Sequence, residues 1–263
     1  MSPPLVLFHG FTGTGEAWRD VIEALPEGTE VWAPDLPGHG SQREHRPASF
    51  EATVDALAAE LEARYAEPVR LAGYSMGGRL ALGLALEHPE RVAELVLISC
   101  HGGLVGAEAR EDRAARDDAL AEDLLGPAGG LEGFVDRWQA LPLFASQAEL
   151  PGVVLDRQRQ RRLAQDPAGL AWALSCLSPG RMPDYGPRLP ELRPPIRLLA
   201  GGLDTKYVAS MGRMAEALGV PAPTVLPDCG HNPLLEAPTG LAAFLAAFQA
   251  MVRVDGGAGE EEL

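Results

Sequence analysis

Short apolar runs alternate along this chain with segments whose apolar residues recur at helical spacing. Leu5–Phe8, Val69–Ala72 and Leu95–Ser99 are nearly continuous in hydrophobic residues, which is typical of strands buried on both faces. Phe50–Leu61 instead carries apolar residues every three or four positions, which predicts a helix. Further strands are predicted at Val31–Ala33, Ile196–Ala200 and Pro223–Leu226, and further helices at Trp18–Leu25, Arg79–Glu87, Met211–Leu218 and Leu241–Phe248. This alternation predicts an α/β fold with a mainly parallel sheet of about six strands and helices on both faces.

The alternation is interrupted once, in the middle of the chain. From about Gly102 to Gly180 the pattern is helical and poor in strands, and it returns to strand and helix at Ile196. We therefore predict a discontinuous core of residues 1–103 and 182–254, with a helical cap at 104–181 inserted into it. Residues 255–263 lack an apolar anchor and are expected to form a disordered acidic tail.

Composition excludes several classes of protein. The 263 residues are 46% hydrophobic and 22% charged, which is too apolar for a disordered chain and sufficient for a large buried core. No apolar run approaches the ~20 residues of a membrane span, and the start lacks the basic residues of a signal peptide. The formal charge of −15 disfavours binding to nucleic acid or to an anionic membrane. Three cysteines are too few for a disulfide framework, which favours the cytoplasm.

The segment Gly73–Gly77 has the pattern Gly-x-Ser-x-Gly. A predicted strand precedes it and a predicted helix follows, as the sharp turn that exposes a nucleophilic serine requires. Ser75 is therefore the candidate nucleophile, and the backbone N–H of Met76 is a candidate donor to an oxyanion. The alternative is a glycine-rich turn whose serine only caps the helix.

A nucleophilic serine needs a base and a carboxylate that orients it. Asp204 and His231 each follow a predicted strand, in the order Ser, Asp, His that this strand–turn–helix arrangement uses. Asp228 is a rival for the orienting carboxylate, although it lies only three residues before His231. Of the remaining histidines, His9 is expected to shape the turn before Phe11, whose N–H is the second candidate oxyanion donor.

These segments together resemble the α/β-hydrolase superfamily, in its usual order over nearly the whole chain. Within it, the chain looks like the 2-succinyl-6-hydroxy-2,4-cyclohexadiene-1-carboxylate (SHCHC) synthases of menaquinone biosynthesis. The resemblance rests on Leu7–Gly13, Gly73–Arg79, Gly103-Leu104, Ala107–Arg113, Trp138–Ser146, Arg162–Leu170 and Asp204–Tyr207. The chain departs from that family after the fourth strand, where it reads Ser99–Gly103 in place of an acidic or small residue run. It also starts at the strand before His9, so we expect it to lack two N-terminal strands that many relatives have.

The resemblance implies a lyase that expels pyruvate from a substrate with three carboxylates. An acidic protein must gather local positive charge to bind such a substrate, and arginine offers a two-pronged donor. Arg79 follows the predicted nucleophile by about one helical turn, while Arg113 and Arg162 lie in the predicted cap. Their alternative role is that of ordinary surface residues, because the chain has 21 arginines and a single lysine, Lys206. The complete set of predicted substrate contacts is Tyr74, Arg79, Arg113, Trp138 and Arg162.

Two other functions use the same residues. A carboxylesterase or C–C bond hydrolase would form an acyl-enzyme on Ser75, and a binding module would use the fold without catalysis. A neutral ester needs none of the arginines, whereas a binding module has no need of a complete triad. We predict no metal and no cofactor, because no nucleotide-binding glycine motif or metal-ligand spacing is present. The expected partner is a small polycarboxylate, with the chain acting as a monomer or homo-oligomer.

Overall fold

The structure, a computed structural model, describes residues 3–126 and 130–256, the last nine as backbone only. Its described residues contain one sheet of six strands in the order β2-β1-β3-β4-β5-β6. All five strand pairs are parallel, which confirms the predicted sheet. The strands are β1 Leu5–Phe8, β2 Val31–Trp32, β3 Val69–Tyr74, β4 Val92–Ile98, β5 Ile196–Gly201 and β6 Thr224–Leu226.

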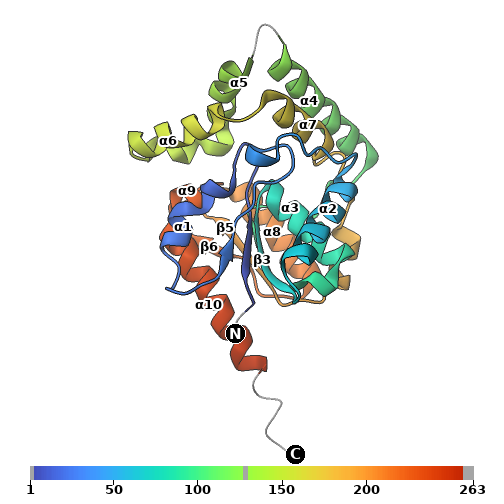
Figure 1. Ribbon diagram of the computed structural model, residues 1–263, viewed down its shortest axis with the longest axis vertical. Coiled ribbons are helices and arrows are strands. Elements are labelled where there is room, and N and C mark those ends of the chain that lie inside the picture. The colour runs from blue at the N-terminus through green and yellow to red at the C-terminus, as the bar shows by residue number, and fades with distance from the viewer. Residues whose placement is uncertain (1–2, 127–129, 257–263) are drawn as a thin grey trace, which may run out of the picture.

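Helices cover both faces of this sheet (Figure 1). One face packs against α2 (Phe50–Arg64), α3 (Met76–Glu87) and α8 (Thr205–Leu218). The other packs against α1 (Arg19–Glu23), α9 (Pro233–Glu236) and α10 (Pro238–Gly256). Successive side chains of a strand point to opposite faces, so each strand contributes to both apolar layers.

The first strand illustrates this division. Val6 and Phe8 lie in the apolar cluster under α2 and α3, whereas Leu5 and Leu7 lie in the cluster under α1 and α10. All four side chains are almost completely buried. The continuous apolar pattern of the strand is thus explained by burial on both sides.

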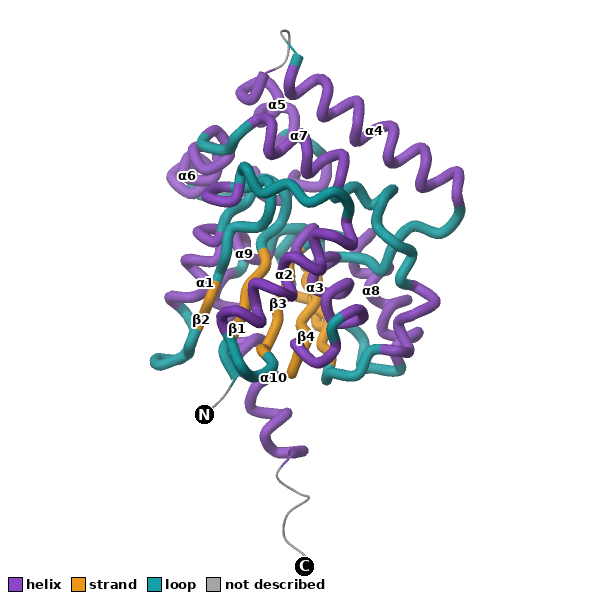
Figure 2. The backbone as a smooth tube through the Cα atoms, turned by 45° about the vertical axis from the view of Figure 1, so that its right-hand side comes forward, coloured by secondary structure: helices purple, strands orange, loops and turns teal. Residues whose placement is uncertain are grey.

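A second layer of helices lies above the carboxyl ends of the strands (Figures 1 and 2). It consists of α4 (Ala107–Leu125), α5 (Gly130–Gln139), α6 (Gly152–Leu163), α7 (Pro167–Cys176) and the 3-10 segment η4 (Pro142–Glu149). These helices fall within residues 104–181. They share their own apolar cluster, which includes Leu124, Phe134 and Leu170, and Phe11 of the sheet layer packs against it. The upper layer therefore has its own core and is joined to the sheet layer near Phe11.

The remaining short elements are 3-10 helices: η1 Gly15–Trp18, η2 Gly40–Gln42, η3 Pro89–Arg91 and η5 Gly186–Glu191. The helix predicted at Trp18–Leu25 is instead split: Trp18 ends η1, and α1 ends at Glu23, before Leu25. Helix α10 continues to Gly256, past the predicted end of the core at residue 254. Residues 257–263 of the predicted acidic tail lie outside the described residues. No helix in the described part of the chain has both the length and the hydropathy needed to cross a membrane.

Candidate active site

Ser75 lies in the sharp turn between β3 and α3. Its φ of 52° places it in the left-handed region, which a residue with a side chain enters only when its surroundings enforce it. The turn is enforced by close packing of backbone, because a Cβ on Gly77 would stand 2.4 Å from the Phe8 carbonyl oxygen. The glycines of the Gly-x-Ser-x-Gly pattern thus allow α3 to approach β1, and this approach fixes the strained turn that carries Ser75.

Ser75, His231 and Asp204 form a continuous chain of hydrogen bonds. Ser75 Oγ lies 3.1 Å from His231 Nε2, and Asp204 Oδ2 lies 2.7 Å from His231 Nδ1. Asp204 and His231 are buried. This is the geometry in which a histidine accepts the serine proton while a carboxylate orients its ring.

Asp204 has a second structural role at the start of α8. Its Oδ1 accepts a hydrogen bond from the backbone N–H of Tyr207 at 3.3 Å, so the same carboxylate caps the helix and contacts His231. Asp228, the rival in the sequence, is exposed in the turn after β6. The two roles of Asp204 fix its carboxylate between the helix and the imidazole.

The segment that holds Phe11 runs beside the serine. A Cβ on Gly10 would lie 3.5 Å from Ser75 Cβ, so the predicted oxyanion turn and the nucleophile are adjacent. His9 stabilises this segment: its Nε2 accepts the Leu36 N–H at 2.9 Å and its Nδ1 donates to the Gly10 carbonyl at 2.8 Å. Burial lowers the pKa of His9 to about 4, so it is neutral at neutral pH.

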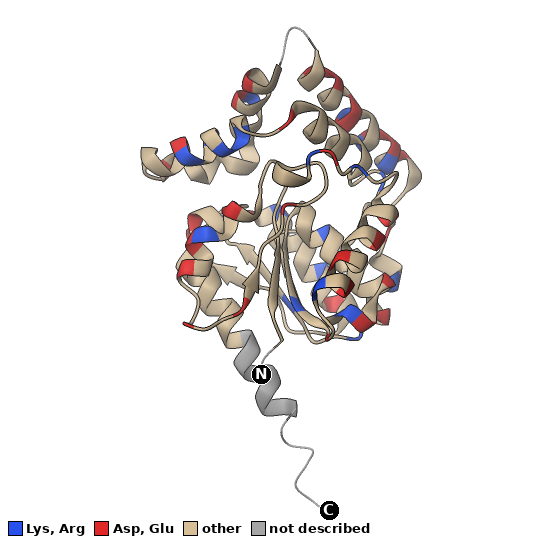
Figure 3. Cartoon of the chain, viewed as in Figure 1, with Lys and Arg blue, Asp and Glu red and all other residues tan. Residues whose placement is uncertain are grey.

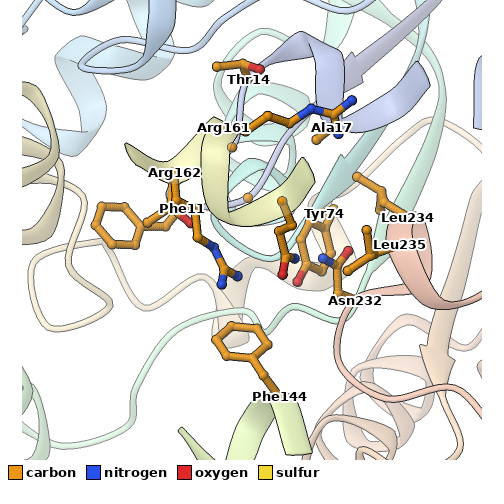
Figure 4. Close-up of a pocket in the computed structure, with 14 residues that line it drawn as sticks. Phe11, Thr14, Ala17, Tyr74, Phe144, Arg161, Arg162, Asn232, Leu234 and Leu235 are labelled. Atoms are coloured by element: carbon orange, nitrogen blue, oxygen red, sulfur yellow. The ribbon is translucent and has the colours of Figure 1, made fainter. Parts of the chain in front are cut away.

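A pocket opens next to this turn (Figure 4). Arg162 extends into it between Phe11, Phe144 and Tyr74, whereas the guanidinium of Arg161 points toward Ala17. Arg162 is 4% exposed, and its Nη1 has no hydrogen-bond partner. Its guanidinium lies 5.4 Å from the centre of the Phe144 ring. Burial lowers its pKa to about 10, which leaves it charged at neutral pH. A buried guanidinium with an unpaired donor has the chemistry to bind an anionic group.

The family model described as "Alpha/beta hydrolase family" matches residues 5–244. The chain belongs to the alpha/beta hydrolase family. It is 35% identical over 240 residues to a Bacillus subtilis protein named provisionally as an SHCHC synthase, covering 90% of this chain and 86% of that protein. It is 32% identical over 244 residues to the SHCHC synthase of Enterobacter sp. (strain 638), covering 93% and 90%. The solved structure of MenH from S. aureus superposes with a TM-score of 0.89 and 32% identity, covering 95% of this chain and 94% of that chain.

Two other arginines that the sequence assigns to the substrate are partnered within this alpha/beta hydrolase. Arg79 is buried and its Nη1 donates to the Leu177 carbonyl at 2.7 Å. Burial lowers the pKa of Arg79 to about 10. Nε of Arg113 donates to both carboxylate oxygens of Asp117 at 3.0 and 2.8 Å. Both cations are thus anchored by protein acceptors, in contrast to Arg162.

Tyr74 and Trp138 are placed differently from each other. Tyr74 lines the pocket, its ring centroid 5.5 Å from that of His231, and burial raises the pKa of its hydroxyl well above the usual value. Trp138 stacks on Phe134 and meets Phe11 edge-on at 5.0 Å, while its buried Nε1 has no partner. Trp138 therefore stands behind Phe11, one layer away from the pocket lining.

Several residues near the site were not predicted from the sequence. The Tyr207 ring centroid lies 4.5 Å from that of His231, and Phe144 meets His231 edge-on at 6.0 Å. Gln158 and Asn232 line the pocket, and Glu236 contacts the His231 loop. Tyr207 lies three residues after Asp204, and Asn232 follows His231 directly. Their nearness to predicted catalytic residues could have identified them from the sequence. Gln158 and Phe144 reach the site only because the upper layer folds over it.

The segment Ser99–Gly103 after β4, where the chain departs from the SHCHC synthase pattern, also borders the site. His101 lies near Arg79 and Arg113, and burial lowers its pKa to about 3, with these cations acting in the same direction. Its Nδ1 accepts the Gly103 N–H at 3.1 Å. Within 3–126 and 130–256 no three His, Cys, Asp or Glu side chains are grouped so that they could hold a metal ion.

Proposed function

We propose that this alpha/beta hydrolase is an SHCHC synthase: a lyase that eliminates pyruvate from 5-enolpyruvoyl-6-hydroxy-2-succinyl-cyclohexene carboxylate. The observation that carries the proposal is the buried, unpartnered Nη1 of Arg162, whose side chain lines a pocket next to the Gly10-Phe11 turn. Burying an unpaired cation is costly, so a site that keeps one is suited to an anionic substrate. The relatives named above for this synthesis support the same conclusion.

In this proposal Ser75, His231 and Asp204 act as the base. His231 Nε2 takes the hydroxyl proton of Ser75, whose oxygen removes the ring proton α to the succinyl carbonyl. The electron pair forms a ring double bond as the C–O bond to the enolpyruvyl group breaks. The proton on His231 then passes to the departing enolpyruvate, which becomes pyruvate, and Ser75 is left protonated. No acyl-enzyme is required.

The remaining predicted site residues have supporting roles in the proposal. The backbone N–H groups of Phe11 and Met76 stabilise the negative charge that develops on the carbonyl oxygen. Arg162 holds one substrate carboxylate, while Arg79 and Arg113 supply positive potential from their anchored positions. Tyr74 forms a wall of the pocket, and Trp138 supports Phe11 from behind.

We further propose that residues 104–181 act as a cap that excludes water from this site, and that the protein acts on its small polycarboxylate in the cytoplasm. The position of α4–α7 above the strand ends supports the first statement, because ligands of open α/β sheets bind at those ends. The three cysteines are all free, which supports the second.

The test is direct turnover of the enolpyruvoyl precursor, with released pyruvate measured through lactate dehydrogenase, beside hydrolysis of p-nitrophenyl acetate. We expect pyruvate release that depends on Ser75 and at most slow ester hydrolysis. Efficient ester hydrolysis without pyruvate release would overturn the proposal and favour a carboxylesterase or C–C hydrolase that acts through an acyl-enzyme on Ser75. Loss of both activities in the Ser75→Ala variant would confirm that one site is being measured.

A further inference from the structure

The loop between β6 and α9, which carries His231, is held by one carboxylate. Glu236 Oε2 accepts the backbone N–H of Gly230 at 2.6 Å. Its other oxygen, Oε1, accepts the backbone N–H of Asn232 at 3.1 Å. These two amides flank His231 on either side, so Glu236 grips the backbone on both sides of the imidazole.

A carboxylate is well suited to this position because both of its oxygens accept hydrogen bonds and neither donates. A glutamine would offer one acceptor and one N–H₂ group, which would face an N–H donor. A charged acceptor also makes shorter and stronger bonds to backbone amides than a neutral one does. The two contacts thus depend on the chemistry of the side chain as well as on its shape.

The opposite side of the same loop is closed by the upper layer. A Cβ on Gly230 would stand 2.0 Å from Ser146 Oγ, so η4 lies directly against the loop. Phe144 of η4 contacts the His231 ring, and Gln147 Nε2 lies 3.5 Å from Glu236 Oε1. The loop is therefore enclosed, and the hydrogen bonds of Glu236 select its backbone conformation within that enclosure.

We propose that Glu236 is a positioning residue: by fixing the backbone on both sides of His231, it directs Nε2 at Ser75 Oγ and Nδ1 at Asp204. This inference rests on the proposed role of Ser75, His231 and Asp204. It adds a fourth side chain on which their alignment depends, although Glu236 itself does not touch the substrate.

The experiment measures the reactivity of Ser75 without a substrate, through its rate of inactivation by a small fluorophosphonate. Ser75 Oγ attacks phosphorus, fluoride leaves, and the hydroxyl proton passes to His231. We expect Glu236→Gln to slow inactivation roughly 10- to 100-fold, as the loss of a charge-assisted hydrogen bond implies. Glu236→Asp keeps two accepting oxygens and should recover part of the rate. The downfield proton resonance of the His231–Asp204 hydrogen bond should shift in Glu236→Gln.

The matched control is Glu94→Gln. Glu94 is likewise a glutamate that accepts from nitrogen donors, but it is buried and its carboxylate pairs with Arg70 Nε at 2.9 Å near the start of β4, at the opposite end of the sheet from Ser75. The Glu94→Gln variant should have a lower melting temperature, but its inactivation rate and its His231–Asp204 proton resonance should be unchanged. Wild-type rates in both Glu236 variants would overturn the proposal, and Glu236→Asp alone decides it if Glu236→Gln does not fold. Failure of the wild-type chain to react at Ser75 would instead overturn the proposed triad, and this inference with it.

Discussion

Three side chains from separate parts of the chain meet in the candidate site, and each depends on the next. In the proposed triad, Ser75 gains nucleophilicity only if His231 accepts its proton, and His231 presents Nε2 only if Asp204 holds Nδ1. The strained backbone of Ser75 contributes to the same arrangement, because its positive φ directs the hydroxyl toward His231. The site is thus a unit whose members should not act additively.

Substitution of this unit gives the first prediction. Ser75→Ala, His231→Ala and Asp204→Asn should each lower kcat by about 10³-fold or more, and double variants should lose little beyond the larger single effect. Pyruvate release from the enolpyruvoyl precursor measures this. Asp228→Asn is the control and should retain activity, because Asp228 is exposed in the turn after β6. The opposite result for the two aspartates would show that Asp204 is not the orienting residue.

The partners of the arginines give the second prediction. Arg162→Gln should reduce kcat/KM for the tricarboxylate about 10- to 150-fold, the value of one charge-assisted hydrogen bond. Hydrolysis of a neutral ester should barely change, since that substrate has no carboxylate to hold. Arg159→Gln is a control on the same helix, because Arg159 pairs with Glu132 and Asp136 at the surface. Equal losses on both substrates would mean that Arg162 only supports the fold.

At the scale of elements, the contact of α3 with β1 shapes the nucleophile turn. Gly73 and Gly77 leave no room for a Cβ: one on Gly73 would lie 2.4 Å from the Gly77 carbonyl oxygen. Gly212, in the middle of α8, has open space around the same position. The two helical glycines, Gly77 and Gly212, therefore differ in the space available for a side chain.

This difference gives the third prediction. Gly77→Ala should lower the melting temperature and activity together, since the new methyl group would push α3 away from β1. Gly212→Ala should instead stabilise the protein by about 0.4–1 kcal/mol, because alanine restricts the unfolded chain and favours the helix. Thermal unfolding of both variants is the measurement. A stable, active Gly77→Ala protein would contradict the packing account of the turn.

At the scale of the whole molecule, charge is spread over both layers. Acidic and basic positions both occur along the helices of the upper layer (Figure 3). Arg159 of α6 pairs with Glu132 of α5, and Arg181, in the turn after α7, pairs with Asp118 of α4. Arg162 differs from these two arginines, because it is buried and its Nη1 has no hydrogen-bond partner.

Buried histidines make global stability depend on pH, which is the fourth prediction. Burial lowers the pKa of His9 to about 4 and that of His39 to about 3, while the unfolded value is about 6.5. Below pH 6.5 the unfolded chain therefore binds protons that the folded chain does not. Above this pH the two histidines should not reduce the free energy of unfolding. As pH drops toward 4, that free energy should fall by up to about 1.4 kcal/mol per pH unit for each histidine.

Melting temperatures at about pH 7, 6 and 5 measure this effect. His39→Gln should be less stable than the wild type at pH 7, because His39 donates to the Pro37 carbonyl, but it should lose less stability on acidification. A melting temperature that does not change between pH 7 and 5 would show that these histidines are protonated in the folded protein.

The sequence by itself determined the order of the elements and which residues make up the candidate site. Apolar runs marked all six strands. In β1, β3, β4 and β5 the runs are nearly continuous because these strands are buried on both faces, whereas the edge strands β2 and β6 are short and partly exposed. The Gly-x-Ser-x-Gly turn identified the position of Ser75, since only small residues fit where α3 meets β1. Asp204 and His231 could be chosen because the ends of parallel strands converge at one edge of a sheet.

Only the tertiary structure decided which polar groups are paired. Arg79, Arg113 and Arg162 are chemically equal in the sequence, yet Leu177 and Asp117 anchor the first two, while Nη1 of Arg162 is left free. Arg79 and Leu177 are 98 residues apart, and no local pattern encodes their contact. The role of Glu236 was equally hidden, because it depends on two backbone amides and not on side chains. Hydrogen-bond partners over such separations are set by how the two layers pack, which the periodicity of the chain does not specify.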